Sequence, residues 1–105
     1  MDTKYQRITA MEAREMMRKH PSAVVLDVRT PEEFATGKIP GAFLLPLYTV
    51  RERAARAFPD KNTLILIYCR SGVRSRDAAH ILLSMGYRNV YDFGGLNAWP
   101  YDREV

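Results

Sequence analysis

The sequence has few of the residues that build disulfide scaffolds and metal centres. It contains 1 cysteine and 2 histidines among 105 residues, so no internal disulfide can form and a zinc site would be short of ligands. No apolar run approaches the ~20 residues that a membrane-spanning helix needs. We therefore expect a single domain over residues 1–105, and the unpaired cysteine favours a reducing, cytoplasmic setting.

The charge is also too weak and too mixed for a protein that binds polyanions. The net charge is +4, with 16 basic and 12 acidic residues interspersed along the chain. The basic stretch at residues 51–56 is typical of a solvated helix face. No longer basic stripe carries the aromatic platforms that nucleic-acid binding uses. We expect neither nucleic acid nor a membrane as partner, and a small anionic substrate fits this charge better.

Apolar runs and helical patterns alternate along the chain. Strand candidates lie at residues 23–26, 63–68 and 90–93, with a turn and a short strand at 39–46. Helical patterns follow the capping boxes at 9–12 and 30–33, occupy 50–58, and extend from the loop after residue 69 to residue 85, whereas residues 94–95 are typical of a loop. This alternation predicts an α/β fold around a parallel sheet. Ligands bind beyond the carboxyl ends of the strands in such sheets.

Cys69 lies at the carboxyl end of the most apolar of these strands. Residues 70–75 form a short polar loop that contains Arg70, Gly72 and Arg74, and a helical pattern follows. Backbone N–H groups and the positive end of a helix dipole favour an anion at such a point, and the two arginines would stabilise a thiolate further. A lone cysteine is more often a small buried hydrophobe. Its place at the end of a strand, beside two arginines, favours a nucleophile instead.

The other residues narrow the chemistry of that nucleophile. There is no second cysteine for a redox pair, and His20 and His80 are expected at the surface rather than beside Cys69. Cysteine phosphatases, which this segment resembles, place one residue more between cysteine and arginine, so that the loop encircles a phosphate. Here only residues 70–73 separate Cys69 from Arg74. The smaller loop fits a smaller anion, or a sulfur atom already attached to Cys69.

Several segments together resemble the single-domain rhodaneses, a family of sulfurtransferases. Residues 68–75 resemble the active-site loop of that family, residues 27–34 and 37–42 its upstream signature, and residues 86–91 and 94–99 its closing segment. The resemblance implies a five-stranded, mainly parallel sheet flanked by helices on both faces. It also implies a ping-pong reaction, in which Cys69 takes a sulfane sulfur from a donor such as thiosulfate, holds it as a persulfide, and passes it to a thiophilic acceptor.

The resemblance also assigns roles to individual residues. Cys69 would be the catalytic nucleophile, and the substrate would be bound by Arg70, Ser71, Gly72, Val73, Arg74 and Ser75. Apart from the resemblance, Asp27 and Arg29 are expected to form a structural pair at a strand end, with a supporting role at the site as the alternative. The loop N–H groups would hold the outer sulfur, and the arginines would attract the oxyanion end of the donor. The acceptor would be cyanide in the test tube and a thiol or a protein partner in the cell. No metal or organic cofactor is implied.

Three positions depart from the family pattern. Lys38 replaces the usual histidine, Leu45 replaces a frequent asparagine, and Val73 replaces a polar residue. The first two lie in a structural segment, whereas Val73 could narrow the range of acceptors. Two other functions stay open: a non-catalytic rhodanese-like module that binds a partner or senses polysulfide, and a cysteine phosphatase, which the loop spacing disfavours.

Overall fold

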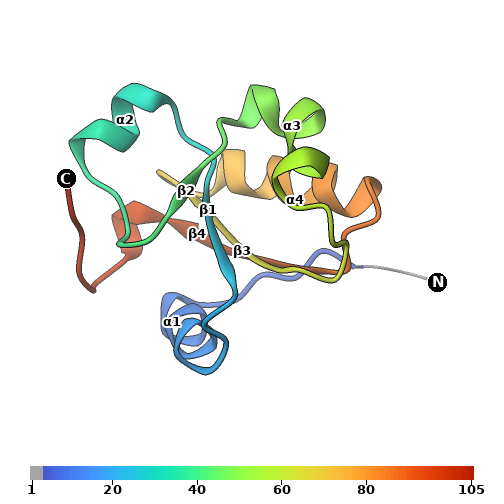
Figure 1. Cartoon of the computed structure of the whole chain (residues 1–105). Coiled ribbons are helices and arrows are strands. Elements are labelled where there is room, and N and C mark those ends of the chain that lie inside the picture. The colour runs from blue at the N-terminus through green and yellow to red at the C-terminus, as the bar shows by residue number, and fades with distance from the viewer. Residues whose placement is uncertain (1–3) are drawn as a thin grey trace.

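The computed structural model describes residues 4–105, and its helices and strands alternate along the chain (Figure 1). In chain order the elements are α1 (Ala10–Lys19), β1 (Val24–Asp27), α2 (Pro31–Thr36), β2 (Phe43–Leu44), the 3-10 turn η1 (Leu47–Thr49), α3 (Val50–Ala57), β3 (Leu64–Cys69), α4 (Val73–Ser84), β4 (Asn89–Gly95) and the 3-10 turn η2 (Leu96–Ala98). Within residues 4–105, no helix is both long enough and apolar enough to cross a membrane.

The strands form one parallel sheet in the order β2-β1-β3-β4. Asp27 at the end of β1 lies opposite Leu44 of β2 and Tyr68 of β3, so the carboxyl ends of these strands meet at one edge. The predicted α/β fold is confirmed, but the expectation of five strands is wrong because the sheet within residues 4–105 has 4 strands. Arg7 forms only an isolated parallel bridge beside β4. Two residues later the chain enters the cap of α1 at Thr9.

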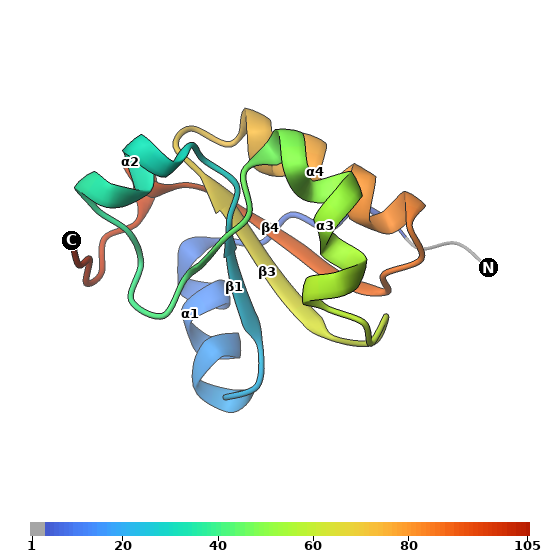
Figure 2. The same cartoon turned by 45° about the horizontal axis from the view of Figure 1, so that its top comes forward.

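Helices cover both faces of the sheet, as the family resemblance implies. Figures 1 and 2 show α1 on one face and α3 and α4 on the other, while α2 lies near the carboxyl ends of the strands. Successive strand residues point to opposite faces, so the strands fill two cores. The core beneath α3 and α4 contains Leu26, Val28, Ile65, Ile67 and Cys69. The core above α1 contains Ala13, Val25, Leu66, Tyr68 and Phe93.

Two predicted capping boxes start helices α1 and α2. The N–H of Glu12 donates to the hydroxyl oxygen of Thr9 at 3.0 Å, and the N–H of Thr9 donates to the carboxylate of Glu12 at 2.9 Å. Thr30 and Glu33 make the same exchange at α2. These helices start where the sequence predicts, because each box satisfies N–H groups that the first turn leaves without partners.

Two boundaries near the carboxyl end of β3 differ from the prediction. Helix α4 begins at Val73, so Arg74 and Ser75 belong to its first turn and not to the loop. Gly94 and Gly95 belong to β4, whereas the sequence predicted a loop there. Gly95 pairs with Cys69, and a Cβ atom on it would collide with the carbonyl group of Arg70. The glycine therefore continues the strand because it lets two backbones approach closely.

Candidate active site

Cys69 is the last residue of β3, and its side chain lies at the base of the loop that leads into α4. The residue is 1% exposed. Its Sγ accepts a hydrogen bond from the N–H of Gly72 at 3.0 Å, so a backbone donor points at the sulfur. Because the sulfur lies so deep, a substrate has to reach it with a narrow terminal atom.

The hydroxyl group of Ser75 is the second polar group at this sulfur. Ser75 is fully buried in the first turn of α4, and its Oγ lies 3.5 Å from Sγ of Cys69. With the thiol protonated, Sγ donates to Ser75, and the Ser75 hydroxyl donates to the carbonyl oxygen of Gly72 at 3.2 Å. A rotation of this hydroxyl toward the sulfur supplies a second donor once the thiol ionises.

Helix α4 begins directly beside the sulfur. Its N-cap, Gly72, has a φ of 108°, and no side chain caps the first turn. A left-handed conformation of this kind favours glycine. The uncapped N–H groups and the positive end of a 12-residue helix therefore meet at the loop. The arrangement suits an anion held at the sulfur.

Arg74 has a partner that the sequence prediction did not assign. Its two terminal nitrogens donate to the two carboxylate oxygens of Glu33 at 2.6 and 2.9 Å. These hydrogen bonds lower the pKa of Glu33 to about 2 and raise the pKa of Arg74. Both side chains therefore stay charged, and the pair joins α2 to α4. The attraction of Arg74 for an oxyanion is reduced, because Glu33 neutralises its charge.

Asp27 and Arg29 form the ion pair that the sequence predicts, at the end of β1. Nη2 of Arg29 donates to the carboxylate of Asp27 at 2.6 Å and to the carbonyl oxygen of Gly37 at 2.7 Å. Burial acts to lower the pKa of Arg29, but the hydrogen bonds and charge of Asp27 outweigh it and the pKa is raised. Next to this pair, the Tyr68 hydroxyl accepts from the N–H of Ile39 at 3.1 Å. These contacts hold the segment after α2 against the sheet.

The remaining loop residues reach the surface. Arg70 and Ser71 are exposed, and Val73 is 55% exposed. Within residues 4–105, the guanidinium of Arg70 has no ion-pair partner, so its positive charge is free to attract an anion toward Cys69. The carbonyl oxygen of Arg70 accepts from the N–H of Asn97 at 3.2 Å, which fixes the backbone of the loop.

His20 and His80 are exposed, as the sequence predicts, and His80 stacks on Tyr5 with the ring centres 4.8 Å apart. No group of three or more His, Cys, Asp or Glu side chains in the described part of the chain is arranged to hold a metal ion.

The sequence prediction missed a hydrogen-bonded support beneath the loop. Asp92 of β4 is fully buried, and its carboxylate accepts from the Tyr5 hydroxyl at 2.5 Å and from the N–H of Gly94 at 2.8 Å. The carbonyl oxygen of Gly94 in turn lies 3.5 Å from Oγ of Ser75. An acidic residue within an apolar strand, two positions before a glycine pair, was the signal available in the sequence.

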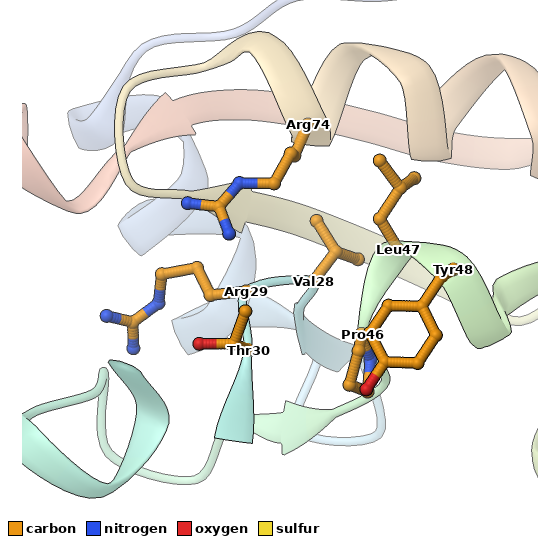
Figure 3. A pocket seen from close by; sticks show the side chains of 7 residues that line it. All are labelled: Val28, Arg29, Thr30, Pro46, Leu47, Tyr48 and Arg74. Atoms are coloured by element: carbon orange, nitrogen blue, oxygen red, sulfur yellow. The ribbon is translucent and has the colours of Figure 1, made fainter. Parts of the chain in front are cut away.

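A cavity with a volume of about 270 Å³ adjoins the loop on the side of α2. It is lined by Val28, Arg29, Thr30, Pro46, Leu47, Tyr48 and Arg74. Figure 3 shows Arg74 above Val28, with Leu47 and Tyr48 on the opposite side from Arg29 and Thr30. We call this cavity the apolar pocket, because side-chain carbon makes up nearly all of its wall.

Comparison with known protein families agrees with this geometry. Residues 9–101 match the model of the rhodanese-like domain. The chain belongs to the rhodanese-like domain family. The match includes Cys69, the whole of α4 and both ion pairs of the site, Asp27–Arg29 and Glu33–Arg74.

Relatives of this rhodanese-like domain include named sulfurtransferases. The thiosulfate sulfurtransferase PspE of Escherichia coli is 45% identical over 71 residues, which cover 68% of each chain. The thiosulfate sulfurtransferase GlpE of Pseudomonas putida is 37% identical over 98 residues, which cover 92% of this chain and 86% of the relative.

Solved structures resemble the fold closely. A rhodanese with anions from Escherichia coli is 39% identical with a TM-score of 0.73, and the alignment covers 78% of this chain and 96% of that one. A rhodanese-like domain protein from Staphylococcus aureus is 34% identical with a TM-score of 0.83, and the alignment covers 95% and 97% of the two chains.

Proposed function

We propose that the protein is a sulfurtransferase of the thiosulfate type, in which Cys69 carries the transferred sulfur as a persulfide. The geometry at Cys69 carries this proposal: a deep thiol at the end of β3, 3.0 Å from the N–H of Gly72 at the start of α4. The names of PspE and GlpE, both thiosulfate sulfurtransferases, support it. Cys69 is the 1 cysteine of the chain, so no other thiol of the protein can hold the sulfur.

In the first half-reaction, the Cys69 thiolate attacks the terminal sulfur of thiosulfate. A bond forms between the two sulfur atoms, the S–S bond of the donor breaks, and sulfite leaves with the electron pair. Charge is conserved, because the thiolate and the thiosulfate dianion become a persulfide anion and the sulfite dianion. Arg70 attracts the oxyanion end of the donor, and the N–H groups at the start of α4, together with Ser75, stabilise the outer sulfur. Asp27 and Arg29 support the neighbouring strand end.

In the second half-reaction, an acceptor thiolate or cyanide attacks the outer sulfur of the persulfide. A bond forms between the acceptor and that sulfur, the S–S bond to Cys69 breaks, and the thiolate of Cys69 is restored with the electron pair. Because the chain contains no second cysteine, the sulfur leaves only to another molecule. A small thiol or a protein partner can serve, and a protein that delivers sulfur can likewise replace thiosulfate.

The structure gives less support to the two other functions. A phosphatase needs a loop arginine that is free to hold phosphate oxygens, whereas both terminal nitrogens of Arg74 are bound to Glu33. A module that only binds a partner has no need of a buried thiol with a backbone donor aimed at its sulfur. Sulfur transfer uses both features.

Mass spectrometry after treatment with thiosulfate tests the proposal. We expect one added sulfur atom on Cys69, removed by cyanide with release of thiocyanate, and no such addition in the Cys69→Ser variant. Absence of the added sulfur, or equal thiocyanate formation by the variant, would refute sulfur transfer. A donor panel that includes a cysteine desulfurase extends the test to protein donors. Hydrolysis of a phosphate ester that is lost in Cys69→Ser would favour the phosphatase.

A cytoplasmic setting belongs to the same proposal. The support for it is the unpaired cysteine, which a reducing compartment keeps as a thiol. Cell fractionation tests this part separately, and recovery of the protein outside the cytoplasm would refute it without affecting the chemistry.

A further inference from the structure

Strand β2 forms an open edge of the sheet. It lies beside β1 in the order β2-β1-β3-β4, and within residues 4–105 no further strand or isolated bridge covers its outer side. The N–H of Leu45 donates to the carbonyl oxygen of Asp27 at 2.9 Å. Because these groups alternate in direction along a strand, the N–H and C=O groups of Leu44 point away from the sheet. They can therefore pair with the backbone of another extended chain.

A groove with a volume of about 490 Å³ lies between this edge and α3. It is lined by Phe43, Leu44, Leu45, Arg53, Arg56 and Ala57. Phe43 pairs in register with Leu26, which packs in the core beneath α3 and α4, so the ring of Phe43 lies on the α3 side of β2. The ring packs edge-on against Phe58 with the ring centres 5.3 Å apart, yet Phe43 stays 46% exposed. The groove thus offers a supported aromatic surface to an apolar side chain.

The rim of the groove is basic. Arg53 and Arg56 are exposed on α3, one helical turn apart, and neither has an ion-pair partner within residues 4–105. Glu52, the one acidic residue of α3, does not line the groove. Two cations beside an open strand edge complement an extended segment that carries carboxylates. They also disfavour pairing with β2 of a second copy, because the arginines of both copies would then lie together.

We propose that the edge of β2 and the groove beside α3 bind an acidic, extended segment of a partner protein, which adds to the sheet as a further strand. The backbone of the segment pairs with Leu44, an apolar side chain packs against Phe43, and carboxylates pair with Arg53 and Arg56. The inference goes beyond the proposed sulfur transfer, because none of these residues belongs to the Cys69 site. The added strand lies three strand spacings from β3, about 14 Å, so the partner is held on the same sheet as the reacting thiol.

The peptide acetyl-TETVTET-amide is a suitable probe of this surface. Alternate side chains of an extended chain share one face, so its valine and both glutamates can point toward α3 together while the threonines point the other way. The peptide acetyl-TKTVTKT-amide has the same length, the same alternation and the opposite charge. A comparison of the two peptides separates the recognition of carboxylates from strand pairing in general.

NMR of the backbone amides of nitrogen-15-labelled protein, titrated with each peptide, measures both the place and the affinity of binding. We expect saturable shifts with the acidic peptide at β2 and α3, including a downfield shift of the Leu44 amide proton as it gains an acceptor. The basic peptide should cause no such shift. Arg53→Glu and Arg56→Glu should each weaken binding of the acidic peptide by about fivefold, because an exposed ion pair is replaced by repulsion.

Arg18→Glu is the matched control, because Arg18 is an exposed arginine on α1, at the opposite face of the sheet (Figure 1). This variant has the same net charge as Arg53→Glu and should bind the acidic peptide as the unmodified protein does. An equal loss of affinity in Arg18→Glu, or no shift of the Leu44 amide at about 1 mM peptide, would overturn the inference.

Sedimentation distinguishes a partner protein from a second copy of this chain. We expect a monomer, whereas a dimer that Phe43→Ala abolishes would assign the edge of β2 to a second copy and overturn the inference. Peptide binding does not involve the thiol, so Cys69→Ser should bind the acidic peptide equally well. The outcome is therefore independent of whether Cys69 transfers sulfur.

Discussion

Glu33 makes two sets of hydrogen bonds at the start of α2, and both depend on its charge. One oxygen accepts from the N–H of Thr30 at 2.9 Å, and the carboxylate also holds both terminal nitrogens of Arg74. Because these bonds lower the pKa of Glu33 to about 2, its contribution to stability is present above the ordinary pKa of a glutamate. That contribution is lost as the pH falls through about 2.

The variant Glu33→Gln should therefore unfold more easily at neutral pH, by about 1 kcal/mol for a partly exposed pair. The difference from the unmodified protein should shrink as the pH falls from 4 toward 2, because the native carboxyl then takes up a proton. Urea unfolding across this pH range measures it. Glu15→Gln is the control, since the pair of Glu15 with Lys19 is long, at 3.9 Å, and exposed. A difference that stays constant down to pH 2 would contradict the assignment.

At the scale of elements, the contact between β4 and the Cys69 loop depends on one missing Cβ atom. Gly95→Ala would push against the carbonyl group of Arg70 and displace the loop that positions the N–H of Gly72. We expect a stability loss of about 1–3 kcal/mol, as for other overpacked sites. We also expect a fall in the rate of persulfide formation at temperatures where the variant is fully folded. Thermal unfolding and stopped-flow loading with thiosulfate measure the two effects.

Gly41→Ala is the control that distinguishes the effect of the steric collision at Gly95 from the effect of ordinary backbone strain. Gly41 has a φ of +81° and no atom within 4 Å of an added Cβ, so the substitution costs about 1–2 kcal/mol of strain in the turn before β2. Its loading rate should match that of the unmodified protein. Equal loading rates in both glycine variants would show that β4 does not position the loop.

The elements differ in how far the sequence determines them. Helices α1 and α2 are predicted correctly because each capping box is a local signal, in which a threonine bonds to a residue three positions later. The extension of β4 through Gly95 and the isolated bridge of Arg7 are decided by contacts between distant segments. The periodicity of apolar side chains along the sequence does not reveal which distant segments come into contact. The expectation of five strands came from the family resemblance. It is wrong because the segment at Arg7 forms an isolated bridge beside β4 and not a strand.

The residues of the site also differ in how far the sequence determines their placement. The place of Cys69 follows from a strand, a loop and a helix that are continuous in the chain, so the sequence predicts it. The pair of Arg74 with Glu33 joins residues 41 positions apart, and Asp92 meets Tyr5 across 87 positions. Only the folded chain brings these groups together, which is why the sequence assigns Glu33 a capping role and leaves Asp92 without one.

For the molecule as a whole, the net charge of +4 should assist the capture of anionic donors. We expect kcat/KM for thiosulfate to fall as salt rises from ~10 to ~300 mM, because ions screen the attraction over a Debye length of about 30 Å at low salt and less than 10 Å at high salt. Steady-state kinetics at several ionic strengths measures the slope.

Two charge-reversal variants distinguish the effect of the net charge from the effect of the local charge of Arg70. Arg70→Glu and Arg88→Glu each change the net charge from +4 to +2, since one positive charge becomes negative. Arg88 directly precedes β4, at the edge of the sheet away from Cys69. We expect the Arg70 variant to lose most of the salt dependence and the Arg88 variant to lose little. Similar losses would assign the effect to net charge alone.

The bidentate contact of Arg74 with Glu33 has a consequence for protein engineering. The segment from Cys69 to Ser75 is short and continuous, so it is an obvious choice for grafting into other parallel sheets. A scaffold that receives it must also supply a carboxylate from a second helix and a side-chain-free residue on the adjacent strand, as Glu33 and Gly95 do here. The transferable unit is therefore a set of three segments held at fixed separation. The seven residues from Cys69 to Ser75 are only one of these segments.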